Sequence, residues 1–157
     1  MTKEGAVAAI WLKRMKRGPM DAVEQAELVA GRGLRGNANQ GGKRQVTLIE
    51  EEVWAEVQAQ LSPAIPPTAR RANVMLRGIR LEKSRGRILR IGTTRLRIYG
   101  ETRPCHQMDE AYEGLRKFLD PHWRAGAFAE VLEGGEIRVG DRVAWEEAQP
   151  GLFSLGV

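Results

Sequence analysis

The segment from Phe128 to Trp145, FAEVLEGGEIRVGDRVAW, alternates short apolar runs with glycine turns. Val131-Leu132 and Ile137–Val139 flank Glu133-Gly134-Gly135, which predicts a hairpin. Gly140-Asp141 then turns the chain into a further short strand. The segment therefore indicates an all-β region, because short apolar runs bounded by turn residues are typical of strands.

Strand patterns continue on the N-terminal side of this segment. Arg87–Tyr99 predicts a second hairpin that turns at Gly92-Thr93-Thr94, because Leu96 and Ile98 alternate with arginines in its second arm. Further short runs with strand character precede it: Ala6–Leu12, Gln45–Ile49 and Asn73–Leu76.

Two segments have the spacing of amphipathic helices. Apolar residues recur at helical intervals over Glu50–Leu61, and acidic residues fill its first turn, where they complement the helix dipole. Met108–Leu119 carries an apolar face and ends before Pro121. Val23–Val29 fits either a helix or a strand, and Gly31–Gly42 is expected to form a flexible glycine-rich loop.

The order of these elements favours a closed or nearly closed β-barrel. Many short strands, frequent glycine turns and no regular alternation of strand and helix are typical of that class. The length of 157 residues suits one hydrophobic core, and no segment of biased composition divides the chain. We therefore expect a mostly β protein with a single domain over residues 1–157.

Charge and composition narrow the partners and the location. The net charge is +5 and the isoelectric point is about 9.8, which favours anionic partners. No apolar run approaches the roughly 20 residues that cross a bilayer. Met1–Gly5 lacks the pattern of a secretory signal, so we expect a cytoplasmic protein without a membrane span. The single cysteine, Cys105, excludes an intramolecular disulfide and a four-cysteine zinc site.

Several well-known catalytic motifs are absent, among them the phosphate-binding P-loop, GxSxG and HExxH. Gly31–Gly36 matches GxGxxG as a string. It neither follows a clear strand nor opens a helix, so it does not indicate a dinucleotide site.

Other short motifs, spread from about Ala8 to Trp145, point to one known family. They are Gly31–Gly36, Arg44–Ile49 (RQVTLI), Arg71-Ala72-Asn73-Val74, Gly78–Leu81, Pro104-Cys105 and Gly134–Val143. In this order they resemble the MOSC domain, the C-terminal domain of molybdenum cofactor sulfurases. The resemblance implies a MOSC-type β-barrel with a few flanking helices. One departure is that the family's glycine loop often reads Gly-Asp followed by a histidine, whereas this chain has Asn37 and Asn39.

The resemblance also implies a function. The chain would bind a molybdenum cofactor of the molybdopterin type, an anionic pterin. It would carry the cofactor or its sulfur, or form the catalytic part of a molybdenum-dependent reductase of N-hydroxylated compounds. In the sulfurases the domain is joined to a pyridoxal-phosphate-dependent cysteine desulfurase, for which this chain has no room. The implied partners are therefore a cysteine desulfurase or an electron-donor protein.

Cys105 is the residue on which this chemistry would depend. In the reductases of the family the cysteine is the protein ligand to molybdenum, and Cys105 stands at that position. Arg103, His106 and the helix expected near Met108 would favour its thiolate, which is a soft metal ligand and a competent sulfur carrier. His106 is a candidate for orienting or protonating groups nearby, and Arg103 for contacting the anionic cofactor. The alternative is an inert, buried cysteine.

The remaining candidate residues would bind the pterin and its phosphate. Arg71 presents a planar fork that suits phosphate, and Asn73 can bond a pterin edge. Lys43 and Arg44 follow the glycine-rich loop, whose backbone amides could approach an anion. We expect Arg44, Arg71 and Asn73 to line one pocket with the cysteine, because one ligand must touch all of them. The alternative is that they are ordinary surface residues.

Two other functions remain open. A nucleic-acid-binding barrel would use the positive charge, but the basic residues are dispersed and aromatic residues make up only 6% of the chain, which disfavours stacking on bases. A barrel without chemistry could serve as an interaction module, a reading that the asparagine at position 37 supports.

Overall fold

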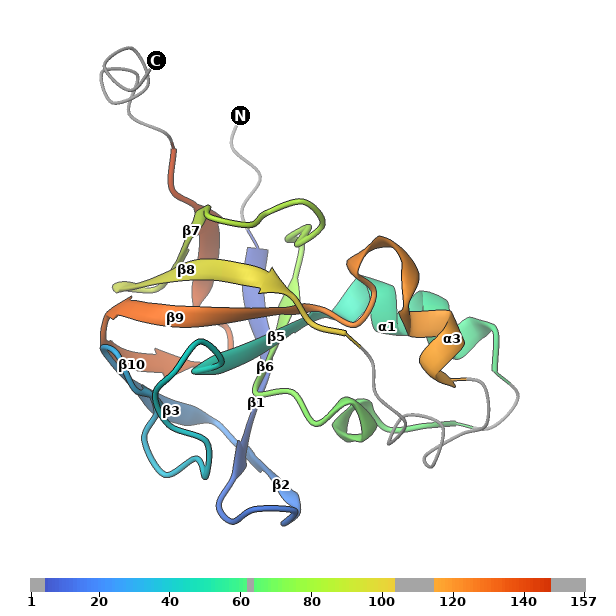
Figure 1. Ribbon diagram of the computed structural model, residues 1–157, viewed down its shortest axis with the longest axis horizontal. Helices are drawn as coiled ribbons and strands as arrows, with labels where there is room; N and C mark the ends of the chain where they lie inside the picture. The colour runs from blue at the N-terminus through green and yellow to red at the C-terminus, as the bar shows by residue number, and fades with distance from the viewer. Residues whose placement is uncertain (1–4, 62–63, 104–114, 148–157) are drawn as a thin grey trace.

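The computed structural model describes residues 5–61, 64–103 and 115–147, and its central feature is a closed β-barrel (Figure 1). Seven strands follow one another around it: β1 (Gly5–Lys13), β11 (Arg142–Trp145), β7 (Ile88–Ile91), β8 (Thr94–Glu101), β9 (Ala127–Glu133), β5 (Val46–Glu50) and β6 (Val74–Arg77). The barrel closes because β1 pairs with both β11 and β6. The β5–β6 pair is parallel, and the other neighbouring pairs are antiparallel. The predicted mostly β barrel is confirmed.

A second, three-stranded sheet lies beside the barrel and consists of β10 (Gly135–Arg138), β3 (Gln25–Val29) and β4 (Gly33–Leu34). The hairpin predicted around Gly134 is wrong in its pairing, because β10 pairs with β3 and not with β9. The reason is that β8 occupies one edge of β9, while on the other edge β5 pairs with Ala127–Ala129 and both backbone groups of Val131 are bonded to Gln45 and Gly31. Gly134 allows the exchange, since a Cβ at this position would lie 2.3 Å from the carbonyl oxygen of Leu28.

The segment that fitted either a helix or a strand, Val23–Val29, is extended. It contains the end of β2 (Met20–Val23), which pairs with β1, and the whole of β3. The glycine-rich loop that follows was expected to be flexible. In the structure the Gln40 side-chain amide donates to the Leu34 carbonyl oxygen at 2.6 Å, which ties the loop to β4.

Within the described residues, the α-helices α1 (Glu51–Ala59) and α3 (Leu115–Leu119) flank the barrel. Figure 1 shows them beside each other at one side of the barrel. Helix α1 confirms the helix predicted over Glu50–Leu61. Of the second prediction, Met108–Leu119, the structure describes the last five residues, which are helical. No helix in the described ranges is long and apolar enough to cross a membrane.

The buried apolar residues form two clusters. One fills the barrel, and its fully buried members include Ile10, Leu48, Leu76, Leu89, Leu96 and Ile98. The other lies between the barrel wall and the helices: Trp11, Ile49, Trp54, Val57, Met75, Leu115 and Leu119. Strands β1, β5 and β6 therefore bury both faces, which explains why their sequences are apolar runs with little alternation.

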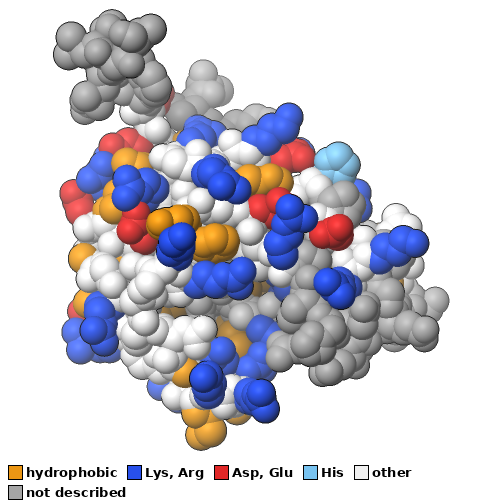
Figure 2. Space-filling model, in the orientation of Figure 1, with side chains coloured by type: hydrophobic (Ala, Val, Ile, Leu, Met, Phe, Trp, Pro, Cys, Tyr) orange, Lys and Arg blue, Asp and Glu red, His pale blue; other side chains and the backbone are white. Residues whose placement is uncertain are grey.

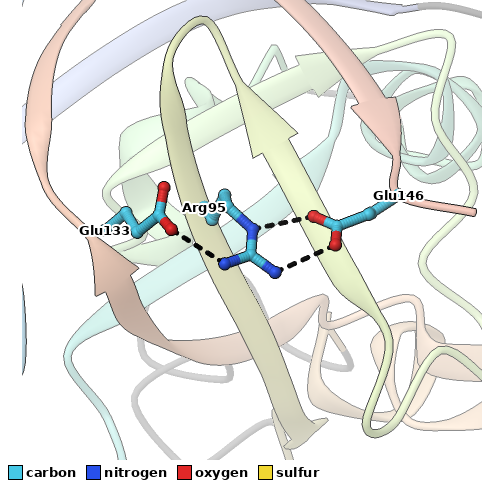
Figure 3. A network of polar contacts seen from close by, with 3 residues as sticks. All are labelled: Arg95, Glu133 and Glu146. Carbon is cyan, nitrogen blue, oxygen red and sulfur yellow. Dashed lines mark hydrogen bonds and ion pairs between the residues drawn. The ribbon is translucent and has the colours of Figure 1, made fainter. Parts of the chain in front are cut away.

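An ion-pair network on the outer wall links β8, β9 and the segment after β11 (Figure 3). Arg95 donates two hydrogen bonds to the Glu146 carboxylate, at 2.8 and 2.9 Å, and one to Glu133 at 2.9 Å. The bonds to Glu146, and then those to Glu133, raise the pKa of Arg95 above its ordinary value. The bonds to Glu146 join β8 to the segment after β11 across the intervening strand β7, so the network supports the closure of the barrel.

Candidate functional site

A pocket with a volume of about 200 Å³ opens where β1 and β8 end and β5, β6 and β9 begin. Antiparallel neighbours bring these strand ends together, so residues from distant parts of the sequence meet there. The pocket lining includes Lys13, Asn37, Arg44, Thr47, Arg70, Arg71, Asn73, Thr102 and Arg103. Figure 2 shows Lys and Arg side chains gathered around a recess in the lower half of this face.

The pocket is strongly basic. Five cationic residues line it: Lys13, Arg44, Arg70, Arg71 and Arg103. Among the described lining residues none is an aspartate or a glutamate. Burial, followed by the charges of Arg71 and Lys16, lowers the pKa of Lys13. A positive group whose pKa is lowered by neighbouring positive groups indicates excess positive charge, which a bound anion would neutralise.

Two consecutive arginines form one side of the pocket. Arg70 is the last residue of the 3-10 segment Pro67–Arg70, and Arg71 ends this segment in a left-handed backbone conformation with φ of 59°. The Arg70 guanidinium donates to the carbonyl oxygen of Ala125. Arg71 Nη2 donates to the carbonyl oxygen of Gly18 at 2.7 Å. A backbone carbonyl oxygen therefore holds each of the two guanidiniums in place.

Lys43 and Arg44, both candidates for binding the cofactor, are separated by the structure. Arg44 lines the pocket, and its guanidinium carbon lies 4.9 Å from the centre of the Phe128 ring. The described lining does not include Lys43, whose ammonium nitrogen lies 5.4 Å from the centre of the Tyr99 ring. Arg103 lines the pocket and lies 3.7 Å from the Asp120 carboxylate in an exposed ion pair.

Asn73 braces the floor of the pocket. Its Oδ1 accepts hydrogen bonds from the backbone nitrogen and the hydroxyl of Thr47, both at 3.1 Å. Its Nδ2 donates to the carbonyl oxygen of Trp11 and to Asn37 Oδ1, both at 3.3 Å. A primary amide has two hydrogens and two acceptor lone pairs, so these four bonds use its full capacity. Asn73 therefore positions the surrounding strands and offers no spare amide hydrogen.

Thr102, unlike Asn73, carries a polar side-chain group that has no partner in the described part of the chain. Its hydroxyl is buried and has no hydrogen-bond partner among the residues that the structure describes. The residue lines the pocket just after the end of β8. A buried hydroxyl without a hydrogen bond costs about 1–3 kcal/mol, and a ligand oxygen in the pocket could supply the missing bond.

The structure brings together four of the predicted binding residues: Arg44, Arg71, Asn73 and Arg103. Cys105 and His106 lie outside the described residues, so their place in the pocket stays a prediction. Sequence reasoning missed Lys13, Arg70 and Thr102. The pair Arg70-Arg71 was a usable signal, because two adjacent arginines before a candidate motif double the local charge. In the described ranges no group of three or more His, Cys, Asp or Glu could hold a metal ion.

Comparison with known proteins identifies one family and several solved structures with a similar fold. The model of the MOSC domain matches residues 35–144. The YuaD protein from Bacillus subtilis is similar with a TM-score of 0.78 and 20% identity, over 95% of this chain and 100% of that chain. YiiM from Geobacillus stearothermophilus has a TM-score of 0.76 and 16% identity, over 94% and 77%. YiiM from Escherichia coli has a TM-score of 0.68 and 14% identity, over 92% and 71%. A search of curated proteins found no significant match.

Proposed function

Because this chain belongs to the MOSC domain family, we propose that its basic pocket binds a molybdopterin-type molybdenum cofactor by the phosphate-bearing end. The observation that carries the proposal is the set of five cations, without a lining carboxylate, in one small cavity. A phosphate monoester has a charge between about −1.5 and −2 at neutral pH and three strong acceptor oxygens. Guanidinium groups match such oxygens in pairs, and three of the arginines come from separate segments that converge here.

The shape of the charge distribution favours a small anion over a nucleic acid. The five cations lie around one recess, whereas a nucleic-acid surface would extend them along a groove with aromatic side chains open for stacking. The rings of Phe128 and Tyr99 already contact cations, Arg44 and Lys43 respectively.

The residues of the pocket fit such a cofactor in two respects. The cations would hold its phosphate, and the unpartnered Thr102 hydroxyl would donate to one of its oxygens. Cys105, two positions after the lining residue Arg103, would supply a thiolate to the metal, because thiolates are soft ligands suited to molybdenum. When bound, the molybdenum centre would supply two-electron redox chemistry.

Two activities are consistent with this proposal. The protein would be the catalytic part of a reductase of N-hydroxylated compounds, with an electron-donor protein as its partner. Alternatively it would carry the cofactor or its sulfur, with a cysteine desulfurase as the partner that supplies sulfur. Both need a reduced thiol at Cys105, so we place the protein in the cytoplasm, where thiols stay reduced.

The decisive experiment is the molybdenum content of purified protein expressed in a host that makes the cofactor. We expect metal in the wild type, little in Cys105→Ser, and reduced metal in Arg71→Glu, which reverses one pocket charge. Arg87→Gln is the matched control, since it removes an arginine that is not among the described lining residues. Equal molybdenum content in the wild type and Cys105→Ser would show that Cys105 does not bind the metal. A wild-type protein without molybdenum would contradict the proposal.

A further inference from the structure

We infer that Phe128 is a positioning residue of the pocket: its ring fixes the Arg44 guanidinium at the wall so that the cation is already in place for an anionic ligand. The inference rests on the proposed function for the identity of the ligand, but not for the contact itself. Phe128 is not among the described lining residues, so it would act through Arg44 and not by touching the ligand.

The contact itself has the geometry of a cation–π interaction. The Arg44 guanidinium carbon lies 4.9 Å from the centre of the Phe128 ring, within the roughly 6 Å at which such contacts are attractive. Arg44 is at the same time a lining residue. Among the residues that the structure describes, no carboxylate pairs with Arg44.

The choice of a ring as the anchor has a functional consequence. A carboxylate partner would fix an arginine equally well, but its negative charge would compete with an anionic ligand for the guanidinium. An aromatic ring has no net charge, so it restricts the side chain while the full positive charge stays available. Arg71 is held in the same manner by a neutral group, the Gly18 carbonyl oxygen. Both arginines are therefore held by groups that carry no net charge.

The ring is itself held from two sides. Tyr99 stacks on it with ring centres 5.9 Å apart and an interplanar angle of 16°. Gly100 lies directly opposite Phe128 in the β8–β9 ladder. A Cβ built at Gly100 would lie 3.4 Å from the ring, which is contact distance, so the ring lies directly over this residue of β8.

The backbone that carries Arg44 is fixed next to this ring by its neighbour, Gln45. The buried Gln45 side chain donates to the Gly42 carbonyl oxygen at 2.9 Å and accepts from the Val131 backbone nitrogen at 2.9 Å. It therefore clamps the segment before β5 onto β9, the strand that carries Phe128. The position of Arg44 is determined both at its backbone and at its guanidinium.

The first arm of the test needs no ligand. We would measure the NMR order parameter of the Arg44 Nε–H group in the wild type, Phe128→Leu and Phe128→Trp. We expect Phe128→Leu to lower it, and Phe128→Trp to keep or raise it, because tryptophan has the strongest cation–π attraction whereas leucine has none. If Phe128 had a purely structural role, the order parameter of Arg44 would not follow the strength of the cation–π attraction. Unchanged order of Arg44 in Phe128→Leu would overturn the inference.

The second arm measures pyrophosphate affinity by titration calorimetry. Phe128→Leu should weaken binding by about two- to fivefold, in line with an exposed cation–π contact. Phe128→Trp should restore it, and in an Arg44→Gln background Phe128→Leu should have no further effect. Additive effects of the two substitutions would overturn the inference, because Phe128 would then act independently of Arg44. Arg87→Gln, which removes the cation of the Arg87–Trp145 pair, should bind like the wild type.

The two arms separate this inference from the proposed function. If Phe128→Leu loosens Arg44 but Arg44→Gln binds pyrophosphate as well as the wild type, the contact stands and the anion-binding role of Arg44 is overturned. If Arg44→Gln weakens binding while Phe128→Leu leaves Arg44 ordered, the pocket stands and the positioning role is overturned. Circular dichroism melting of each variant verifies that it is folded.

Discussion

Asn73 Nδ2 donates a hydrogen bond to Asn37 Oδ1 over 3.3 Å, and this bond joins the glycine loop to the segment before β6 at the floor of the basic pocket. The same Asn37 oxygen accepts the backbone N–H of Lys13 at 2.9 Å. Asn37 therefore serves chiefly as an acceptor. An aspartate, which the family's loop often has, could accept the same two bonds but would add a negative charge.

The first prediction follows from this relationship. Asn37→Asp should fold normally and bind pyrophosphate about tenfold more weakly, which corresponds to about 1.4 kcal/mol, because its charge offsets one of the five pocket cations. Asn37→Ala loses both accepted bonds and should lower the free energy of unfolding by about 1–3 kcal/mol. Calorimetry and urea denaturation measure the two effects. Undiminished affinity in Asn37→Asp would show that pocket charge does not control binding.

The second prediction concerns the unpartnered hydroxyl of Thr102. Thr102→Val replaces it with a methyl group of similar size, so the free protein should gain about 1 kcal/mol of stability, or about 2–4 °C in melting temperature. Pyrophosphate affinity should fall in the same variant, because the hydroxyl can no longer donate to the ligand. Thr102→Ser keeps the hydroxyl and is the control. A variant that loses stability and affinity together would indicate a structural role instead.

The third prediction uses the lowered pKa of Lys13. Burial and the charges of Arg71 and Lys16 lower this pKa, so Lys13 loses its proton at a lower pH than an exposed lysine. Phosphate affinity should therefore begin to fall below about pH 10.4, the ordinary lysine value, as one pocket cation disappears. Inorganic phosphate is a suitable probe, because its charge hardly changes over this alkaline range. Lys13→Met should bind more weakly at neutral pH and lack this early decline, and an identical decline in both proteins would contradict the assignment.

The sequence predicted the helices and strands better than it predicted which strands pair. Periodicity located the β7–β8 hairpin and helix α1, because alternation and helical spacing are local signals. Periodicity gave the wrong partner for β10, because the residues after Gly134 carry no information on whether the edges of β9 are already occupied. Pairing partners are decided by the closed barrel as a whole and not by the strand's own residues.

The same distinction applies to the pocket. Arg44, Arg71 and Asn73 could be predicted to converge because they belong to motifs of a recognisable family. Lys13 could not, because it begins a basic run, Lys13–Pro19, that is typical of an exposed loop, and the pairing of β1 with β6 brings it to the pocket. The role of Asn73 also needed the structure, since an amide that can bond a ligand and one that is fully used internally look alike in sequence.

A buried acid outside the pocket gives the fourth prediction. Glu50 ends β5 at the start of α1 and is only 6% exposed. Burial raises its pKa from 4.5 to about 7, against the opposing effects of the Leu81 backbone hydrogen bond and the Arg80 charge. Between these two values the folded protein keeps a proton on Glu50 that the unfolded chain has already lost.

The sign of the resulting pH dependence is therefore fixed. Because the unfolded state binds fewer protons in this range, the free energy of unfolding falls as the pH rises from about 4.5 to about 7, and the loss is complete above that. Glu50→Gln imitates the protonated acid and should escape this loss. Its advantage over the wild type in urea denaturation should grow by about 2 kcal/mol between about pH 5.5 and pH 8.5. Parallel stability curves for the two proteins would mean that Glu50 titrates normally and that its burial is relieved by water or by movement of the segment after β6.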